Sequence, residues 1–390
     1  TTTHIRTMFL SSTRNTLFSS STIRRRAIIV SSKATRSLVR TSSLSPSQSK
    51  LQLQLVRCMT THGCSGIQKV TIVGAGTLGT QVALQTAITG HEVTVLDVTD
   101  EALTVCRRNH AAILQTYLAR DQDHNNQARG WKGLSSVTKS AEEVVQDTMQ
   151  RLHYTTDTAE AMQECDLVSE NVPESPDIKA STYAKLSEHC THNEKTIFTT
   201  NSSTLLPSDF VEHTGRPANF LALHFANGIW DANIAEVMPH PATDEAIVNK
   251  VLDFAKDIHM VPFYVQKEQN GYLINSLLVP WLNAAQSLVT NGVSTPSDVD
   301  KVWLISMGGY HHQDPSTTRA PFIVMDTIGL PLVAGVFSYW GDIYGDAQMT
   351  ANAAYLQEHY VTQGKLGITN GNPKEDTSEG IYSYPNPEFM

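Results

Sequence analysis

The first pattern with chemical meaning in this 390-residue sequence is a glycine motif, Gly74-Ala75-Gly76-Thr77-Leu78-Gly79, which follows a β-rich stretch at 67–73. A helical stretch at 80–89 and a second β-rich stretch at 92–96 complete a strand–helix–strand unit. The first glycine permits a tight turn, the second lets the backbone approach a pyrophosphate, and the third lets the helix pack close to the strand. The free N–H groups at the start of the helix would bind the phosphates.

An acidic residue follows the second β-rich stretch. Asp97 stands 18 residues beyond Gly79, a spacing typical of dinucleotide-binding units. Its carboxylate can accept hydrogen bonds from a ribose 2′-hydroxyl and would repel a 2′-phosphate. The unit therefore predicts a Rossmann-type domain that binds NAD rather than NADP. A glycine-rich turn in another kind of α/β protein is the alternative.

Polar residues follow three further predicted strands, at 166–172, 195–200 and 220–223. Open α/β sheets bind their ligands at the carboxyl ends of strands, so these positions are candidates for chemistry. His224 ends the last of these strands, and Glu236 lies twelve residues further on. Oxidation of an alcohol with NAD needs a base, and a carboxylate beside an imidazole would orient that base. The alternative for Glu236 is a solvated acid at the end of a strand.

Charge is distributed unevenly along the sequence. Residues 1–66 contain eight arginines, two lysines and no acid, whereas the whole chain has a net charge of −9. An acid-free segment rich in Arg, Ser and Thr is typical of a transit peptide, so we expect 1–66 to be a disordered leader to the mitochondrial matrix. A basic arm that touches nucleic acid is the alternative. The remaining chain is strongly acidic, which disfavours nucleic-acid binding because Lys and Arg bind phosphates.

Helical stretches dominate the C-terminal part, at 272–291, 295–307, 330–344 and 351–363. We therefore predict an α/β protein with a doubly wound Rossmann NAD-binding domain at 67–266 and a mostly helical domain at 267–390. No apolar run approaches the ~20 residues that cross a bilayer, which argues against membrane insertion. The five cysteines are scattered without C-x-x-C or Cys/His ligand spacing, so we expect neither a metal site nor a disulfide framework.

Several segments resemble the L-3-hydroxyacyl-CoA dehydrogenase family of the short-chain, or 3-hydroxybutyryl-CoA, type. They are GAGTLG with LD (74–97), ENVPESPDIK (170–179), TNSST (200–204), LHFAN (223–227) with AE (235–236), GYLINSLLVPWL (271–282), and GKLG (364–367) with EGIY (379–382). The resemblance runs from Ile67 to the last residues. It implies a Rossmann domain followed by a helical dimerising domain. The implied reaction is NAD-dependent conversion of an L-3-hydroxyacyl-CoA to the 3-oxoacyl-CoA, usually in mitochondrial β-oxidation.

The resemblance implies roles for residues that match the family's motifs. His224 would be the general base and Glu236 its orienting partner. Ser203 would hydrogen-bond the reacting oxygen, and Asn275 would help to hold the substrate from the second domain. Ser202 is the alternative to Ser203, because alternation along an extended chain would point it to the opposite face.

The resemblance also implies which residues contact the cofactor and the coenzyme A. To the glycine loop and Asp97 it adds Glu174, Lys179 and Asn201 as NAD-binding residues. It places a helical hairpin over the CoA in the region 107–139. Basic residues outnumber acidic ones there, and a solvated helix face is the alternative explanation; these residues are Arg107, Arg108, Arg120, Arg129, Lys132 and Lys139.

The sequence departs from the family's pattern at three places. Gly228 stands where the family usually has a proline, and the bulky Trp230 follows it. Two insertion-like stretches, 311–319 and 370–377, interrupt the second domain. These departures leave the acyl-chain preference open. The adjacent histidines at 311 and 312 point apart and lack a carboxylate at ligand spacing, so we expect no metal there.

Two other functions remain possible on the same fold. One is a dehydrogenase of a non-thioester hydroxy acid, such as L-gulonate or L-carnitine. The other is a non-enzymatic NAD-binding structural protein. The second is disfavoured because Ser203, His224, Glu236 and Asn275 are all present, and a sensor needs no proton acceptor. The family resemblance also implies a homodimer formed through the C-terminal helices.

Overall fold

The computed structural model describes residues 64–123, 127–136, 138–190, 195–307, 319–368 and 378–384. Residues 64–66, at the end of the proposed leader, are described, whereas 1–63 lie outside these ranges. The histidine-containing stretch at 311–318 and the stretch at 370–377 also lie outside the described residues.

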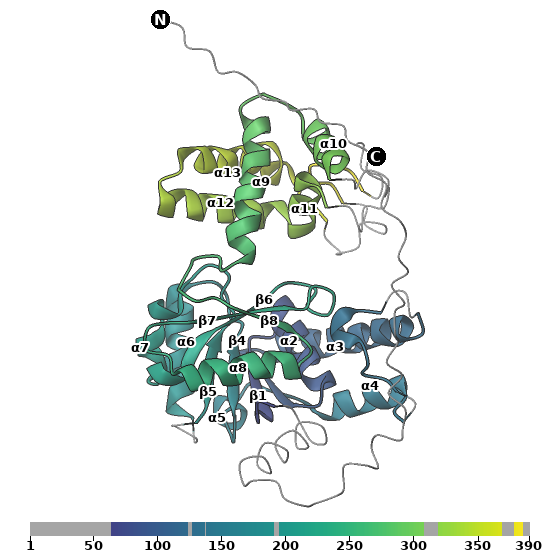
Figure 1. Ribbon diagram of the computed structural model, residues 1–390, viewed down its shortest axis with the longest axis vertical. Coiled ribbons are helices and arrows are strands. Elements are labelled where there is room, and N and C mark those ends of the chain that lie inside the picture. The colour runs from purple at the N-terminus through teal and green to yellow at the C-terminus, as the bar shows by residue number, and fades with distance from the viewer. Residues whose placement is uncertain are drawn as a thin grey trace, which may run out of the picture. The chain divides into compact units, whose positions relative to one another are not determined.

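One eight-stranded sheet organises the N-terminal part, in the order β3-β2-β1-β4-β5-β6-β7-β8 (Figure 1). All neighbouring strands are parallel except β6 and β7, which are antiparallel. The doubly wound α/β prediction is confirmed, with the difference that the sheet is mixed. The strands are β1 (Lys69–Val73), β2 (Glu92–Leu96), β3 (Leu152–Thr155), β4 (Leu167–Glu170), β5 (Ile197–Thr200), β6 (Phe220–Phe225), β7 (Ile234–Pro239) and β8 (Val261–Tyr264).

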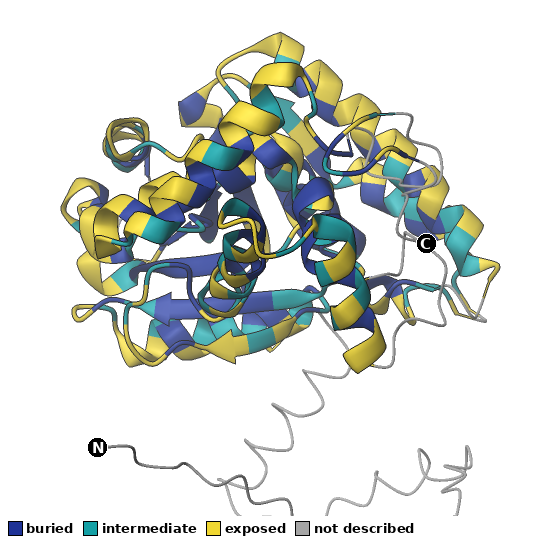
Figure 2. Cartoon of the chain, turned by 90° about the horizontal axis from the view of Figure 1, so that it is seen from above, coloured by how far each residue is buried: buried dark blue, intermediate teal, exposed yellow. Residues whose placement is uncertain are grey.

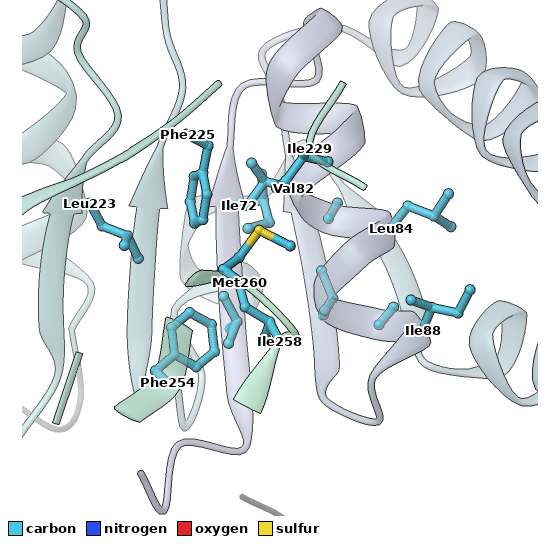
Figure 3. Close-up of a cluster of buried hydrophobic side chains, with 14 of the residues drawn as sticks. Ile72, Val82, Leu84, Ile88, Leu223, Phe225, Ile229, Phe254, Ile258 and Met260 are labelled. Carbon is cyan, nitrogen blue, oxygen red and sulfur yellow. The ribbon is translucent and has the colours of Figure 1, made fainter. Parts of the chain in front are cut away.

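Helices cover both faces of this sheet. Successive side chains of a strand point to opposite faces, so Ile72 joins one core cluster and Val73 another. The first cluster packs under α2, α3, α4 and α8, and Figure 3 shows part of it between the strands and α2. The second packs under α5, α6 and α7. Their bounds are α2 (Thr77–Ile88), α3 (Asp100–Asp121), α4 (Ala141–Gln150), α5 (Thr158–Ala161), α6 (Pro176–Glu188), α7 (Val211–Thr214) and α8 (Glu245–Asp257).

The C-terminal part is helical, as predicted, and has its own apolar core. That core joins buried side chains of all five helices, including Leu282, Leu304, Phe322, Phe337 and Leu356. Figure 2 shows that the helices turn exposed outer faces to the solvent and that most of the strand residues are buried, whereas the edge strand β8 is largely exposed. The helices are α9 (Ile274–Thr290), α10 (Pro296–Ser306), α11 (Pro321–Ile328), α12 (Leu330–Tyr344) and α13 (Ala347–His359).

Among the described residues, no single helix has the length and apolar character needed to cross a membrane. Only α11 and α12 taken together meet these criteria, and they are bent by 102° at the break between them.

Candidate active site

The glycine loop joins β1 to α2, and its conformation explains why glycines stand there. Gly74 has a φ of +102°, and a Cβ added to it would lie 2.6 Å from the carbonyl oxygen of Asn171. A Cβ on Gly79 would lie 2.0 Å from the carbonyl oxygen of Gly74. A Cβ on Gly76 would meet no atom within 4 Å, so the loop is open to a ligand at this position. Gly76 is the N-cap residue of α2, which has no acid in its first turn and no side-chain cap.

Asp97 directly follows β2, beside this loop. Its Oδ2 accepts a 2.7 Å hydrogen bond from the backbone N–H of Ala75, and its Oδ1 accepts one of 2.7 Å from Val98. Asp97 and the loop line a cavity of about 930 Å³ that α6 closes on another side. The lining residues drawn from the predicted cofactor set are Gly74, Ala75, Gly76 and Asp97.

The other predicted cofactor residues form a polar network at the ends of β4 and β5. Lys179 is buried, with its Nζ 2.8 Å from Oε1 of Glu170 and 3.2 Å from Oε2 of Glu174. Burial alone would raise the pKa of the Glu174 carboxyl. The Lys179 ammonium and the hydroxyls of Ser202 and Thr204 instead hold that pKa below its ordinary value. Glu174 is therefore ionised at neutral pH.

The same network contains one residue that the sequence analysis predicted, Asn201, and one that it did not, Glu170. Asn201, which it named, accepts a 2.9 Å hydrogen bond from the N–H of Phe225 and donates one of 2.6 Å to Asn171. It thus joins the ends of three strands. Glu170, which it missed, is fully buried and accepts hydrogen bonds from Lys179, Tyr183 and others. The available signal was its place at the carboxyl end of a predicted strand, where open α/β sheets bind their ligands.

His224 and Glu236 lie directly opposite each other on β6 and β7. The Nδ1 of His224 is 2.8 Å from Oε2 of Glu236, and both side chains are buried. Directly opposed residues of an antiparallel pair have their Cβ atoms about 5 Å apart, so the register alone brings the two groups together. The explanation of Glu236 as a solvated strand-end acid is wrong, because its exposed fraction is 0%.

The loop after β5 brings a serine to the other side of the imidazole. The Oγ of Ser203 is 3.1 Å from Nε2 of His224. The Oγ of Ser202 faces elsewhere, where it hydrogen-bonds Glu174 and accepts a 2.9 Å bond from the N–H of Leu205. Of the two serines that the sequence analysis weighed, Ser203 is the one beside His224.

The first residues of α9 reach the same loop. The amide of Asn275 donates to the carbonyl oxygen of Ser203 at 3.4 Å. The four residues predicted to be catalytic are therefore in one place, although they come from the loop after β5, from β6, from β7 and from α9. Tyr272, which the sequence analysis did not single out, stacks its ring on His224 with centroids 4.8 Å apart.

The departure at Gly228 has a structural basis. Gly228 has a φ of +70°, which proline cannot adopt, and its N–H donates to Oε1 of Gln81 at 2.8 Å. The next residues turn toward the α3–α4 connection, where the rings of Trp230 and Trp131 stack 5.0 Å apart. Asp231 pairs with Arg120 at 2.6 Å. The loop that begins at Gly228 is thus held against α2, α3 and the α3–α4 connection.

No group of three or more His, Cys, Asp or Glu side chains in the described part of the chain is arranged to hold a metal ion. The family model of the 3-hydroxyacyl-CoA dehydrogenase NAD-binding domain matches residues 69–269, and that of the C-terminal domain matches 271–375.

The chain belongs to the 3-hydroxyacyl-CoA dehydrogenase family. It is 27% identical to the mitochondrial hydroxyacyl-coenzyme A dehydrogenase of Rattus norvegicus over 318 residues, which cover 82% of this chain and 91% of that protein. It is 26% identical to the 3-hydroxybutyryl-CoA dehydrogenase of Clostridioides difficile, over 81% of this chain and 99% of that protein.

A solved structure of a diketoreductase is also similar, and at higher identity. It is 38% identical to this chain, covers 82% of this chain and 99% of its own, and superposes with a TM-score of 0.68. It is described by its substrate-directed dual catalysis of dicarbonyl compounds. Family membership gives this 3-hydroxyacyl-CoA dehydrogenase homologue an NAD-binding domain, as predicted.

Proposed function

We propose that the protein is an NAD-dependent L-3-hydroxyacyl-CoA dehydrogenase, which interconverts an L-3-hydroxyacyl-CoA and the 3-oxoacyl-CoA. The observation that carries this proposal is the buried His224, held between the Ser203 hydroxyl and the Glu236 carboxylate. Bound NAD supplies the hydride acceptor. The chain's own residues must hold the alcohol and take its proton.

Each residue then has one step to perform. The Nε2 of His224 removes the hydroxyl proton of the substrate, and Ser203 hydrogen-bonds the same oxygen. Glu236 fixes the Nδ1–H tautomer and stabilises the imidazolium as it forms. Asn275 approaches the reacting oxygen from the second domain. In the reducing direction His224 returns the proton.

For the cofactor, we propose that the glycine loop and Asp97 hold the adenosine half and its pyrophosphate. The cavity beside Asp97 has the walls and the volume for a nucleoside. Glu174, Lys179 and Asn201 would then shape the nicotinamide end. Because Lys179 is buried between two carboxylates, we assign it the task of holding Glu174 in place.

The family relationship also supports the wider proposals. We propose a boundary at 266/267 between the NAD-binding and helical domains, and a homodimer formed through the helices. We further propose that 1–66 is a mitochondrial transit peptide and that the enzyme serves β-oxidation. The curated relative from Rattus norvegicus is mitochondrial by name.

A second candidate is a dehydrogenase of a non-thioester 3-oxo compound, and a specific observation favours it. The diketoreductase is 38% identical to this chain, whereas the hydroxyacyl-CoA dehydrogenase of Rattus norvegicus and the 3-hydroxybutyryl-CoA dehydrogenase of Clostridioides difficile are 27% and 26% identical. Two cations of the predicted CoA region are also engaged within the chain. Arg120 pairs with Asp231, and Lys139 pairs with Asp147 at 2.7 Å.

One assay separates the two candidates. The full chain is given NADH with acetoacetyl-CoA, and in parallel with dehydrocarnitine and with a free dicarbonyl compound, and NADH absorbance is followed. Fast oxidation with the thioester and competitive inhibition by free CoA support the first proposal. Turnover confined to the free carbonyl compounds, with no effect of CoA, supports the second and overturns the first.

A further inference from the structure

A turn at the start of the second domain contacts both members of the His–Glu pair. The ring of Tyr272 stacks on the imidazole of His224 with centroids 4.8 Å apart and an interplanar angle of 25°. Tyr272 is fully buried, so its ring shields this face of His224 from water. The opposite partner, Glu236, is touched by the next two residues of the same turn.

The two carboxylate oxygens of Glu236 accept hydrogen bonds from different partners. Oε2 is bound to His224, and Oε1 accepts hydrogen bonds from the backbone N–H groups of Leu273 and Ile274 at 2.8 and 2.9 Å. Ile274 is the first residue of α9, so these donors belong to the positive end of a 17-residue helix. The orientation of the carboxylate therefore depends on where α9 begins.

The turn has an uncommon backbone conformation. Gly271 and Tyr272 both have positive φ, +76° and +54°. The left-handed region is sparsely occupied by residues other than glycine, so the surroundings must impose it on Tyr272. Trp340 of α12 lies against the turn so closely that a Cβ on Gly271 would be 2.4 Å from its ring. The helical core thus sets the position of Tyr272.

Polar contacts fasten the same segment to the loop that carries Ser203. The carboxylate of Glu268 accepts from the N–H of Ser208 at 2.8 Å, and the amide of Asn270 donates to the carbonyl oxygen of Thr204 at 2.8 Å. The segment before α9 is therefore held against both sides of the imidazole.

The hydroxyl of Tyr272 plays no part in this arrangement. It is buried and has no hydrogen-bond partner in the described part of the chain. The aromatic ring, not the hydroxyl, is thus the part of the side chain that acts on His224. Phenylalanine would preserve that contact, and an aliphatic residue would remove it.

We propose that Tyr272 is a positioning residue for the base: its ring holds the imidazole of His224 in the orientation that aims Nε2 at the substrate, and it does so only while the start of α9 is docked on Glu236. The inference rests on the proposed role of His224 and extends it. Catalytic geometry on the sheet then depends on a residue that the helical domain positions.

The test compares three variants of the full-length enzyme. Tyr272→Leu removes the ring and should lower kcat by about 10- to 100-fold, because a base displaced by about 1 Å loses that much rate. The Kd for NADH should change less than about threefold, because the ring lies at the imidazole rather than at the glycine loop. Tyr272→Phe keeps the ring and should retain kcat within about twofold.

Phe254→Leu is the matched control. Phe254 is a buried ring of α8 that also contacts a histidine, His91, with centroids 5.4 Å apart, and it lies outside the site. This variant should lose stability but keep kcat. If Tyr272→Leu does not fold, Tyr272→Met replaces it, since methionine fills irregular apolar gaps.

Three results would overturn the inference. Wild-type kcat in folded Tyr272→Leu would do so, as would equal losses of kcat in Tyr272→Leu and Phe254→Leu. A loss in Tyr272→Phe as large as in Tyr272→Leu would assign the effect to the hydroxyl instead.

A structural readout keeps this inference separate from the proposed function. Crystal structures of wild type and Tyr272→Leu with NADH should show the imidazole rotated away from Ser203 in the variant. An unchanged imidazole would overturn the inference even if no substrate is found. An inactive wild type with a rotated imidazole in the variant would refute only the proposed substrates.

Discussion

Two buried acids, one in each half of the molecule, have opposite tasks. Glu236 on β7 and Asp326 on α11 are both fully buried, and both accept hydrogen bonds from backbone N–H groups of a distant segment. The donors to Glu236 lie at the start of α9, and the donors to Asp326 are the N–H groups of Ile381 and Tyr382. The difference lies in the remaining partner.

The remaining partner decides what each acid can do. Asp326 has a neutral one, the hydroxyl of Tyr384 at 3.0 Å, and burial raises its pKa to about 7. Asp300 is in the same position, with the hydroxyl of Tyr382 at 3.0 Å and a pKa raised by burial to about 7. Glu236 instead faces an imidazole, which can take up a proton during a reaction. The first arrangement fastens chain segments, and the second can support proton transfer.

The largest expected effect comes from breaking the pair on the sheet. His224→Gln removes the proton acceptor, so kcat should fall by about 10²–10⁴-fold. Binding of NADH should change little, because the glycine loop and its cavity lie elsewhere. Stopped-flow turnover and NADH fluorescence titration measure the two quantities. If the variant keeps its turnover, His224 is not the base and Glu236 has no catalytic role to contrast with Asp326.

The sequence predicts the cofactor loop better than the base pair, and the reason is physical. The motif is local in the sequence, because Gly79 packs against the carbonyl oxygen of Gly74 within the strand–turn–helix unit. Gly74 is constrained by its positive φ in the turn and also by the carbonyl oxygen of Asn171 after β4. His224 was identifiable because it stands at the carboxyl end of a predicted strand, although β6 continues to Phe225. Its exact pairing with Glu236 required β7, an antiparallel strand that the alternation of the sequence did not reveal.

Residues whose role comes from distant contacts escaped the sequence analysis. Tyr272 acts on a histidine 48 positions earlier, and Asp326 binds the N–H of Ile381, 55 positions later. Neither residue has a local pattern that would distinguish it from an ordinary apolar or acidic helix residue. The helical stretches that correspond to α9, α10, α12 and α13 were predicted in order, whereas α11, which carries Asp326, and the contacts between the helix ends were not.

The second prediction concerns Asp326, the buried acid of the helical core, and its replacement by asparagine. The pKa of Asp326 is about 7 in the folded chain and 3.8 ordinarily, so the folded chain holds the proton more tightly. The contribution of this proton to the free energy of unfolding is fully present below pH 3.8 and is lost as the pH rises to 7. The loss is up to ~1.4 kcal/mol per pH unit. Asp326→Asn carries no such charge and should unfold with a flatter pH dependence.

Urea unfolding of both proteins between pH 5 and 8 measures this difference. The slope should not vanish in Asp326→Asn, because Asp300 still titrates in the same direction. The kcat of the variant should equal that of wild type. Parallel stability curves would mean that Asp326 stays ionised throughout, and a lowered kcat would remove the contrast with Glu236.

The smallest expected effect tests a third acid, Asp97, which is half-buried and faces a cavity rather than a base or a chain segment. Its carboxylate already accepts hydrogen bonds from the backbone N–H groups of Ala75, Val98 and Thr99, which keep it aimed at the cavity. Asp97→Ala removes the acceptor for a ribose hydroxyl and the repulsion of a 2′-phosphate. The preference for NADH over NADPH in kcat/KM should narrow roughly tenfold, the value of one hydrogen bond to a charged group. In Asp97→Asn, which keeps one acceptor, this preference should lie between those of wild type and Asp97→Ala. An unchanged ratio in Asp97→Ala would show that the ribose is held by other groups, and then only Glu236 among these three acids would serve the reaction.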